Sequence, residues 1–139
     1  MKLIICLCGI VAVVTAVSKE KFSLSSESLK RMHSVAIPCA EEFNVDPAFI
    51  SKVGDPESFP RTEANNKFIH CFAVKSGITN ADGHMNLEKL VGIVGDHPLA
   101  GEIREIIKKC NEITKEDAIA TVIAMHDCYG EKFPLRFEF

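Results

Sequence analysis

Four cysteines spread along the chain constrain its fold more than any other feature. Cys39, Cys71, Cys110 and Cys128 are separated by 31, 38 and 17 residues. These intervals are too wide for a zinc knuckle or a CxxC redox pair, but they suit two disulfides in a small secreted domain. The cysteines therefore indicate a scaffold and not a reactive site.

The two remaining cysteines, Cys6 and Cys8, lie in an N-terminal segment typical of a signal peptide. Lys2 precedes an apolar run over 3–14, and small residues stand at the end of the segment. We predict that residues 1–16 are removed, both cysteines with them. A membrane anchor is the alternative, but the run is shorter than the roughly 20 apolar residues of a spanning helix.

The predicted mature chain, residues 17–139, has the length of one domain. Without Lys2 it holds 15 basic and 19 acidic residues, and its sequence shows no run of Lys and Arg. An acidic chain of this kind is a poor candidate for binding nucleic acid or an anionic membrane. The predicted signal peptide leads us to expect a secreted, extracellular protein. The composition leads us to expect that it neither binds nucleic acid nor inserts into a membrane.

Apolar residues recur at helical spacing through most of the chain, and no strict alternation of the strand kind is found. The predicted helices cover 26–43, 47–53, 64–75, 87–94, 98–110 and 115–129. Asp46 and Asn86 are placed as N-caps of the second and fourth helices, and Pro38 should bend the first. The predicted fold class is all-α, a compact bundle of about six short helices.

The last predicted helix has the most explicit local signature. Thr114 and Asp117 have the spacing of a capping box, and Ile113 and Ala118 are placed as a hydrophobic staple. Gly130 should end the helix. We therefore predict a helix that begins directly after Thr114.

The C-terminal tail carries a separate pattern. Phe133, Leu135, Phe137 and Phe139 alternate with charged residues or proline. An extended tail would present all four side chains on one face, and such a face should pack against the rest of the protein.

Four cysteines allow three disulfide connectivities, and the sequence alone does not choose among them. Sequential pairing is favoured because one predicted helix ends at Cys110 and its antiparallel neighbour carries Cys128. On a chain-entropy model, closing each of the two loops would add about 3 to 4 kcal/mol of stability.

In its cysteine spacing, its order of helices and its leader, the whole predicted mature chain resembles the insect odorant-binding proteins of the pheromone-binding and general odorant-binding type. The usual family pattern has six cysteines, and the four here match the first, third, fourth and sixth. The second and fifth, which are partners in the family, would fall at Lys67 and Ile119. Their joint absence is similar to the Minus-C subclass. The stretch 75–83 also resembles the family's link between its third and fourth helices.

The resemblance implies the pairings Cys39 with Cys71 and Cys110 with Cys128. It also implies an apolar cavity between converging helices, in which a secreted carrier transports odorants, pheromones or similar volatiles in olfaction. No cofactor is implied. The partners it implies are a small hydrophobic molecule and, downstream, a membrane receptor, with the carrier acting as a monomer or weak homodimer.

Nine apolar residues are the candidates for lining such a cavity. They are Phe72, Val91, Val94, Ile107, Val122, Ile123, Met125, Phe133 and Leu135. Each of them could equally be ordinary core, because pockets and cores use the same side chains. The tail could form a flap over the cavity, or it could simply be docked on the surface.

His126 is the one histidine placed on an apolar helical face, a turn before the predicted helix end. Protonation of a buried histidine there could release a ligand at low pH. The alternative is a hydrogen-bonded histidine without a switching role.

Enzyme and metal motifs do not appear in the sequence. GxSxG, HExxH and a glycine-rich phosphate loop are all missing. A calcium loop centred on Gly83 would put Ile78 and Lys89 where carboxylates are required. We therefore expect neither catalysis nor a metal. The alternatives are a general hydrophobe carrier or interaction protein of haemolymph or gland secretion and, less favoured, a small secreted lipid-acting enzyme.

Overall fold

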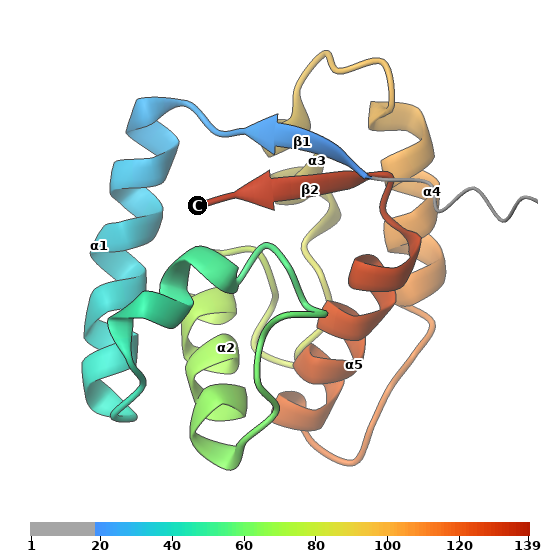
Figure 1. Cartoon of the computed structure of the whole chain (residues 1–139). Helices are drawn as coiled ribbons and strands as arrows, with labels where there is room; N and C mark the ends of the chain where they lie inside the picture. The colour runs from blue at the N-terminus through green and yellow to red at the C-terminus, as the bar shows by residue number, and fades with distance from the viewer. Residues whose placement is uncertain (1–18) are drawn as a thin grey trace, which may run out of the picture.

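The computed structural model describes residues 19–139, so the predicted signal peptide lies outside the described residues. Figure 1 shows a short pair of strands with helices below it and at its two sides. The elements in chain order are β1 (Glu20–Ser23), α1 (Ser26–Glu42), the 3₁₀-helix η1 (Pro47–Lys52), α2 (Glu63–Lys75), α3 (Leu87–Val94), α4 (Ala100–Cys110), α5 (Ala118–Lys132) and β2 (Leu135–Glu138). The predicted all-α bundle is confirmed in its helices, and the strand pair is an addition to it.

The two disulfides join neighbouring helices in pairs. Cys39 is bonded to Cys71, which links α1 to α2, and Cys110 is bonded to Cys128, which links α4 to α5. The Cα atoms of each pair are 5.9 Å apart, within the usual range for a disulfide. The favoured sequential connectivity is therefore confirmed.

The buried side chains form two apolar clusters, one around each disulfide. The first contains Cys39 and Cys71 together with Phe68, and the second contains Cys110 and Cys128. Each disulfide thus staples a pair of helices around its own small core. The space between the two cores is where the fold can leave a cavity.

Two of the predicted N-caps are confirmed. The carboxylate of Asp46 accepts a hydrogen bond from the Ala48 amide at 2.9 Å, and the side chain of Asn86 accepts one from the Lys89 amide at 3.0 Å. Both bonds satisfy amides that the first turn of a helix leaves free. The second helix is shorter and tighter than expected, since it is a 3₁₀-helix.

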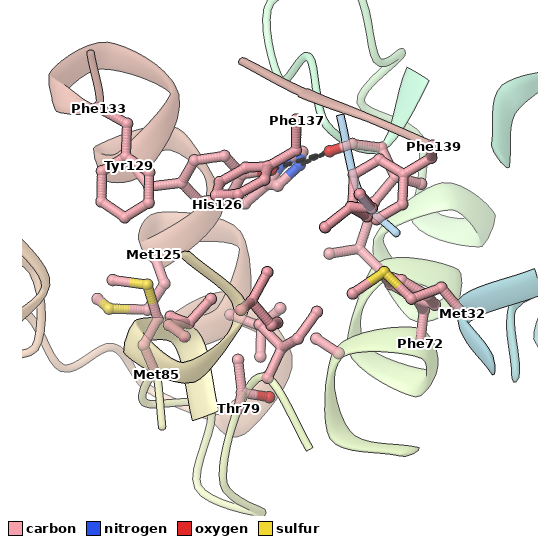
Figure 2. A pocket seen from close by; sticks show the side chains of 18 residues that line it. Met32, Phe72, Thr79, Met85, Met125, His126, Tyr129, Phe133, Phe137 and Phe139 are labelled. Atoms are coloured by element: carbon pink, nitrogen blue, oxygen red, sulfur yellow. Dashed lines mark hydrogen bonds between the residues drawn. The ribbon is translucent and has the colours of Figure 1, made fainter. Parts of the chain in front are cut away.

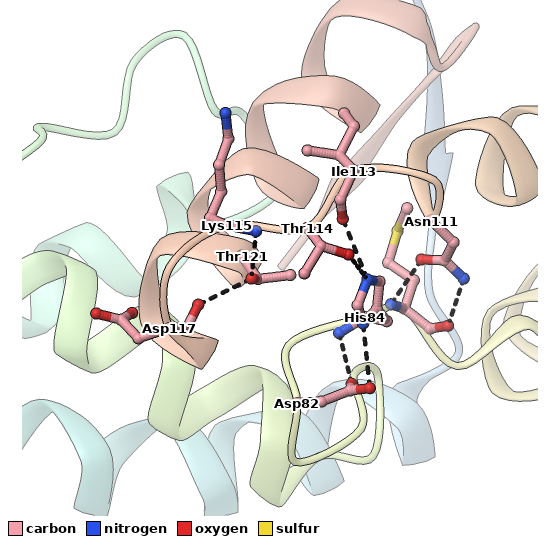
Figure 3. A network of polar contacts seen from close by, with 9 residues as sticks. Asp82, His84, Asn111, Ile113, Thr114, Lys115, Asp117 and Thr121 are labelled. Atoms are coloured by element: carbon pink, nitrogen blue, oxygen red, sulfur yellow. Dashed lines mark hydrogen bonds and ion pairs between the residues drawn. The ribbon is translucent and has the colours of Figure 1, made fainter.

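The predicted start of the last helix is wrong. Helix α5 begins at Ala118, and its N-cap is Asp117, whose carboxylate accepts from the Ala120 amide at 2.8 Å. The hydroxyl of Thr114 is not a cap, because it lies 3.1 Å from Nε2 of His84 in a neighbouring loop (Figure 3). The Thr114 hydroxyl, which the local pattern predicts as a helix cap, instead makes a tertiary contact with His84.

The predicted end of this helix is also wrong, since α5 continues past Gly130 to Lys132. A glycine stands at this position for a packing reason. A Cβ built on Gly130 would lie 2.7 Å from the ring of Pro56. The missing side chain therefore lets the loop before α2 approach α5 closely.

The expectation of no strands fails at the two ends of the described chain. Strand β1 pairs with β2 in parallel, with Phe22 opposite Phe137. Figure 1 shows this pair between α1 and α4, above α2 and α5. The tail is therefore extended, as its alternation suggested, and an N-terminal segment holds it in place through backbone hydrogen bonds.

A polar network ties the loop between α2 and α3 to the loop between α4 and α5 (Figure 3). His84 lies 3.1 Å from Asp82 through Nδ1 and 3.1 Å from the Ile113 carbonyl through Nε2. Asn111 exchanges two hydrogen bonds of 2.9 Å with the backbone of Met85. Hydrogen bonds from the backbone and side chain of His84 hold the pKa of Asp82 below its ordinary value.

Within residues 19–139, no helix combines the length and apolar character that crossing a bilayer requires. This finding adds nothing to the assignment of residues 1–16, which remains a prediction.

The close approach of the tail to Gly54 gives a first test of the fold. A Cβ on Gly54 would lie 2.0 Å from the carbonyl oxygen of Phe137 and 2.7 Å from the ring of Phe139. We predict that Gly54→Ala displaces β2 and lowers the free energy of unfolding by about 1 to 3 kcal/mol, as overpacking does. Urea unfolding measures this change.

The matched control is Gly101→Ala on α4, where a Cβ would meet nothing within 4 Å. There alanine should raise the free energy of unfolding by about 0.5 to 1 kcal/mol, because glycine is unfavourable inside a helix. Equal changes in the free energy of unfolding for Gly54→Ala and Gly101→Ala would contradict the close packing of the tail against Gly54.

Candidate functional site

A cavity of about 70 Å³ lies between the two cores (Figure 2). Helices α1, α2, α3 and α5, the loop before α3, and the tail all contribute side chains to its wall. Nearly all of these side chains are apolar, and the polar ones are Thr79, His126 and Tyr129. The cavity is therefore suited to an apolar molecule with few hydrogen-bonding groups.

Two helices form opposite walls through single helical faces. On α2 the lining residues are Ile69, Phe72 and Ala73, and on α5 they include Val122 and Met125. Their spacings of three and four residues place each set on one side of its helix. The same periodicity that predicted buried faces in the sequence thus also positions the cavity wall.

The tail forms the roof of the cavity. Phe137 and Phe139 line it, and Figure 2 shows both on the side opposite Thr79. The ring of Phe137 packs edge-on against Phe22 of β1 at 5.6 Å, and that of Phe139 against Phe72 of α2 at 6.1 Å. The apolar face of the tail therefore packs onto the cavity, although Leu135 is buried in the core around the second disulfide.

Four of the nine candidate residues line the cavity: Phe72, Val122, Met125 and Phe133. The structure places the other five elsewhere. Val94, Ile107 and Leu135 belong to the core around Cys110–Cys128, Val91 is half-buried on α3, and Ile123 borders an outer groove between α2 and α5.

These five residues lie elsewhere because helical periodicity predicts which side chains are buried, but not which of the buried side chains border the cavity. Ile123 follows Val122 by one residue, which turns it about 100° around α5. Conversely, Met32 and Leu90 line the cavity from two helices that the apolar spacing predicts, although neither is among the nine candidates. Ile78 and Met85 also line it, but they lie in a loop that carries no periodic signal.

His126 borders the cavity with both ring nitrogens engaged. Nε2 donates to the Val53 carbonyl at 2.9 Å, and Nδ1 accepts from the Arg61 guanidinium at 2.9 Å. The Tyr129 hydroxyl donates to the same Val53 carbonyl at 2.9 Å, and Arg61 also forms an ion pair with Asp127. Because an arginine can only donate, the imidazole in this network is neutral.

Burial lowers the pKa of His126 from 6.5 to about 4, and the neighbouring Arg61 acts in the same direction. The hydrogen bond to Val53 and the charge of Asp127 oppose this shift without cancelling it. Burial also raises the pKa of Tyr129 far above its ordinary value. The folded protein therefore keeps both groups neutral at pH 5 to 7, and ligand release through His126 stays a prediction that applies near pH 4.

Thr79 carries the cavity's unsatisfied polar group. Its side chain is 6% exposed, and its hydroxyl is buried without a hydrogen-bond partner among the described residues. A buried hydroxyl without a partner costs stability. By contrast, Thr121 has a fully bonded hydroxyl that donates to the Asp117 carbonyl at 2.8 Å and accepts from the Lys115 amide at 3.1 Å (Figure 3).

Metal ligands do not gather anywhere in the described chain. Across residues 19–139 no group of three or more His, Cys, Asp or Glu side chains is placed to hold an ion. The cavity wall offers a bound molecule noncovalent contact with apolar and aromatic side chains.

The fold and the site define a disulfide-stapled helical domain with an apolar cavity. The chain belongs to the PBP/GOBP family, because the model of that family matches residues 21–132. Proteins of this family are non-enzymatic carriers. The chain is also similar to general odorant-binding protein 57c of Drosophila melanogaster, with 27% identity over 119 residues, 80% of this chain and 78% of the relative.

The lowered pKa of His126 predicts a loss of stability in acid. The unfolded chain takes up a proton near pH 6.5, whereas the folded one does so only near pH 4. Stability is therefore retained above pH 6.5 and falls by about 3 kcal/mol as the pH drops to 4. The glutamine of His126→Gln does not titrate, so this part of the pH dependence should disappear when the free energy of unfolding is measured in urea at each pH. An unchanged dependence of stability on pH would contradict a lowered pKa at His126.

The contrast between the two buried threonines gives another prediction. Thr79→Val removes an unpaired hydroxyl and should leave the free energy of unfolding unchanged or raise it by about 1 kcal/mol. Thr121→Val leaves the Lys115 amide without its partner and should lower it by about 1 to 2 kcal/mol. Thermal unfolding compares the two, and a Thr79→Val variant as unstable as Thr121→Val would show that the Thr79 hydroxyl is bonded.

Proposed function

We propose that this protein is a secreted carrier that binds a small hydrophobic molecule noncovalently in the cavity between its two disulfide-stapled cores. The observation that carries the proposal is the wall itself, which four helices and the tail close with apolar side chains. Phe72, Val122, Met125 and Phe133 are the predicted residues that would contact the ligand. Secretion through residues 1–16 is part of the proposal.

The driving force is the removal of apolar surface from water, worth about 25 cal/mol per Å² before the entropic cost of binding. The cavity of about 70 Å³ is smaller than the roughly 300 to 1,000 Å³ of typical ligand sites. Binding therefore requires side chains or the roof to move. Of the lining residues, methionines adapt most easily, because their side chains are unbranched.

The contacts that hold the tail over the cavity are of a kind that would allow it to move. It is held by two strands of four residues, by an ion pair of 3.1 Å between Lys21 and Glu138, and by ring contacts. Exposed ion pairs contribute little to stability. In this proposal the tail is therefore a flap over the cavity, and the pairing of β1 with β2 holds it closed.

The ligand class we propose is that of odorants, pheromones or similar volatiles. Family membership and the name of the fruit-fly relative support this choice. Delivery to a membrane receptor by a monomeric or weakly dimeric carrier completes the proposal. A general hydrophobe carrier in haemolymph or gland secretion would use the same cavity.

Displacement of an environment-sensitive fluorescent probe from the oxidised mature protein tests the carrier function. Small apolar molecules should displace the probe saturably at micromolar levels. Ala73 lines the cavity, so Ala73→Leu should fill it and abolish probe uptake. Ala120 borders the outer groove, so Ala120→Leu should leave uptake unchanged.

Urea unfolding of both variants verifies that they are folded. A parent protein that takes up no probe under any condition would contradict the proposal and favour an interaction protein with a filled core. Uptake that survives Ala73→Leu would place the binding site elsewhere.

A further inference from the structure

A second hollow of about 100 Å³ lies between α1 and α3, on the outer side of the cavity. We call it the α1–α3 cleft and define it by Arg31, Lys75 and Lys89 at its rim and by Met32 and Ile93 at its base. The remaining lining side chains are two serines and a valine. The cleft is therefore apolar at its base and cationic at its rim.

The cleft and the cavity share a wall. Met32 and Ile93 line both of them, so these two side chains separate the cavity from the outside at this point. Figure 2 shows Met32 at the edge of the cavity beside Phe72. Rotation of an unbranched methionine side chain costs little, and it would join the two hollows into one channel.

The charge of the cleft is opposite to that of the whole protein. The chain has a formal net charge of −3, yet the side chains that line the cleft include three cations and no carboxylate. These cations come from α1, α2 and α3, so only the fold brings them together. An anionic group would therefore be attracted to this mouth of the cavity.

Two of the three cations have partners outside the cleft, and one is free. Arg31 lies 3.1 Å from Glu27, and Lys75 lies 3.5 Å from Glu42. Lys89 forms no ion pair within residues 19–139, and it is half-buried. A larger neighbouring hollow also contains Glu88, whose carboxylate lies 3.7 Å from Arg104. Lys89 is therefore the cation available to a ligand.

We propose that the cavity and the α1–α3 cleft together bind a fatty acid, with its hydrocarbon chain in the cavity and its carboxylate at Lys89, beside Lys75 and Arg31. This inference rests on the proposed carrier function, and it narrows the proposed ligand to a hydrophobic molecule with an anionic head. The apolar base accepts the chain, and the cationic rim accepts the head. A neutral alcohol of the same chain length fills the cavity equally but gains nothing from the rim.

The test is displacement of a neutral naphthylamine probe by a straight-chain fatty acid and by the primary alcohol of equal length, with parent protein, Lys89→Met and Lys109→Met. Lys109 is an exposed lysine on α4 outside the cleft, so its replacement makes the same change in net charge. Lys89→Met should weaken the fatty acid about fivefold to tenfold, the size of one partly exposed charge-assisted contact. The affinity of Lys89→Met for the alcohol should stay within about twofold of the parent value. Lys109→Met should bind both ligands with the parent's affinity.

Each of the other outcomes has a definite meaning. Equal loss with Lys109→Met, or no loss with Lys89→Met, would overturn the cleft as the site of the head while the carrier function stands. A parent protein that binds the alcohol and rejects the acid would overturn the ligand class. Failure of both ligands to displace the probe would instead count against the carrier function itself. Weaker fatty acid binding in high salt, with unchanged alcohol binding, would support the ionic contact.

Discussion

The structure depends above all on the two disulfides, because each holds one pair of helices around its own core. Cys39–Cys71 fixes α1 against α2, and Cys110–Cys128 fixes α4 against α5. Among residues 19–139 no disulfide joins the two halves. The resemblance to six-cysteine family members places the missing pair at Lys67 on α2 and Ile119 on α5. The halves meet where α2 packs against α5 and where Arg61, just before α2, contacts His126 and Asp127 of α5. The cavity lies at this meeting.

The sequence was sufficient for features that local chemistry determines. Apolar spacing located the helices, Asp46 and Asn86 marked two helix starts, and the cysteine order favoured the observed disulfides. It failed where a distant contact decides the outcome. Thr114 bonds to His84 instead of capping α5, and β1 is a strand only because the tail lies beside it. The cavity was half predicted for the same reason, since burial follows from periodicity and a void follows from three-dimensional packing.

Charge and burial divide the polar groups of the site into two kinds. His126 is held neutral inside by burial and by Arg61, which lower its pKa to about 4. The lysines and the arginine of the α1–α3 cleft lie outside, at the opening that Met32 and Ile93 close. In the proposed complex the apolar interior would hold the hydrocarbon chain of the ligand, and the rim would attract its anionic head.

The most direct test of the central claim is the nuclear magnetic resonance of isotope-labelled methionine methyl groups during titration with a hydrophobic ligand. After Met1 the chain has three methionines, Met32, Met85 and Met125, and all three line the cavity. If the ligand occupies the cavity, all three methyl signals should shift together and saturate at one ligand per protein. Saturable binding that leaves the three signals unmoved would contradict the account, because the ligand would then lie outside the space between the two cores.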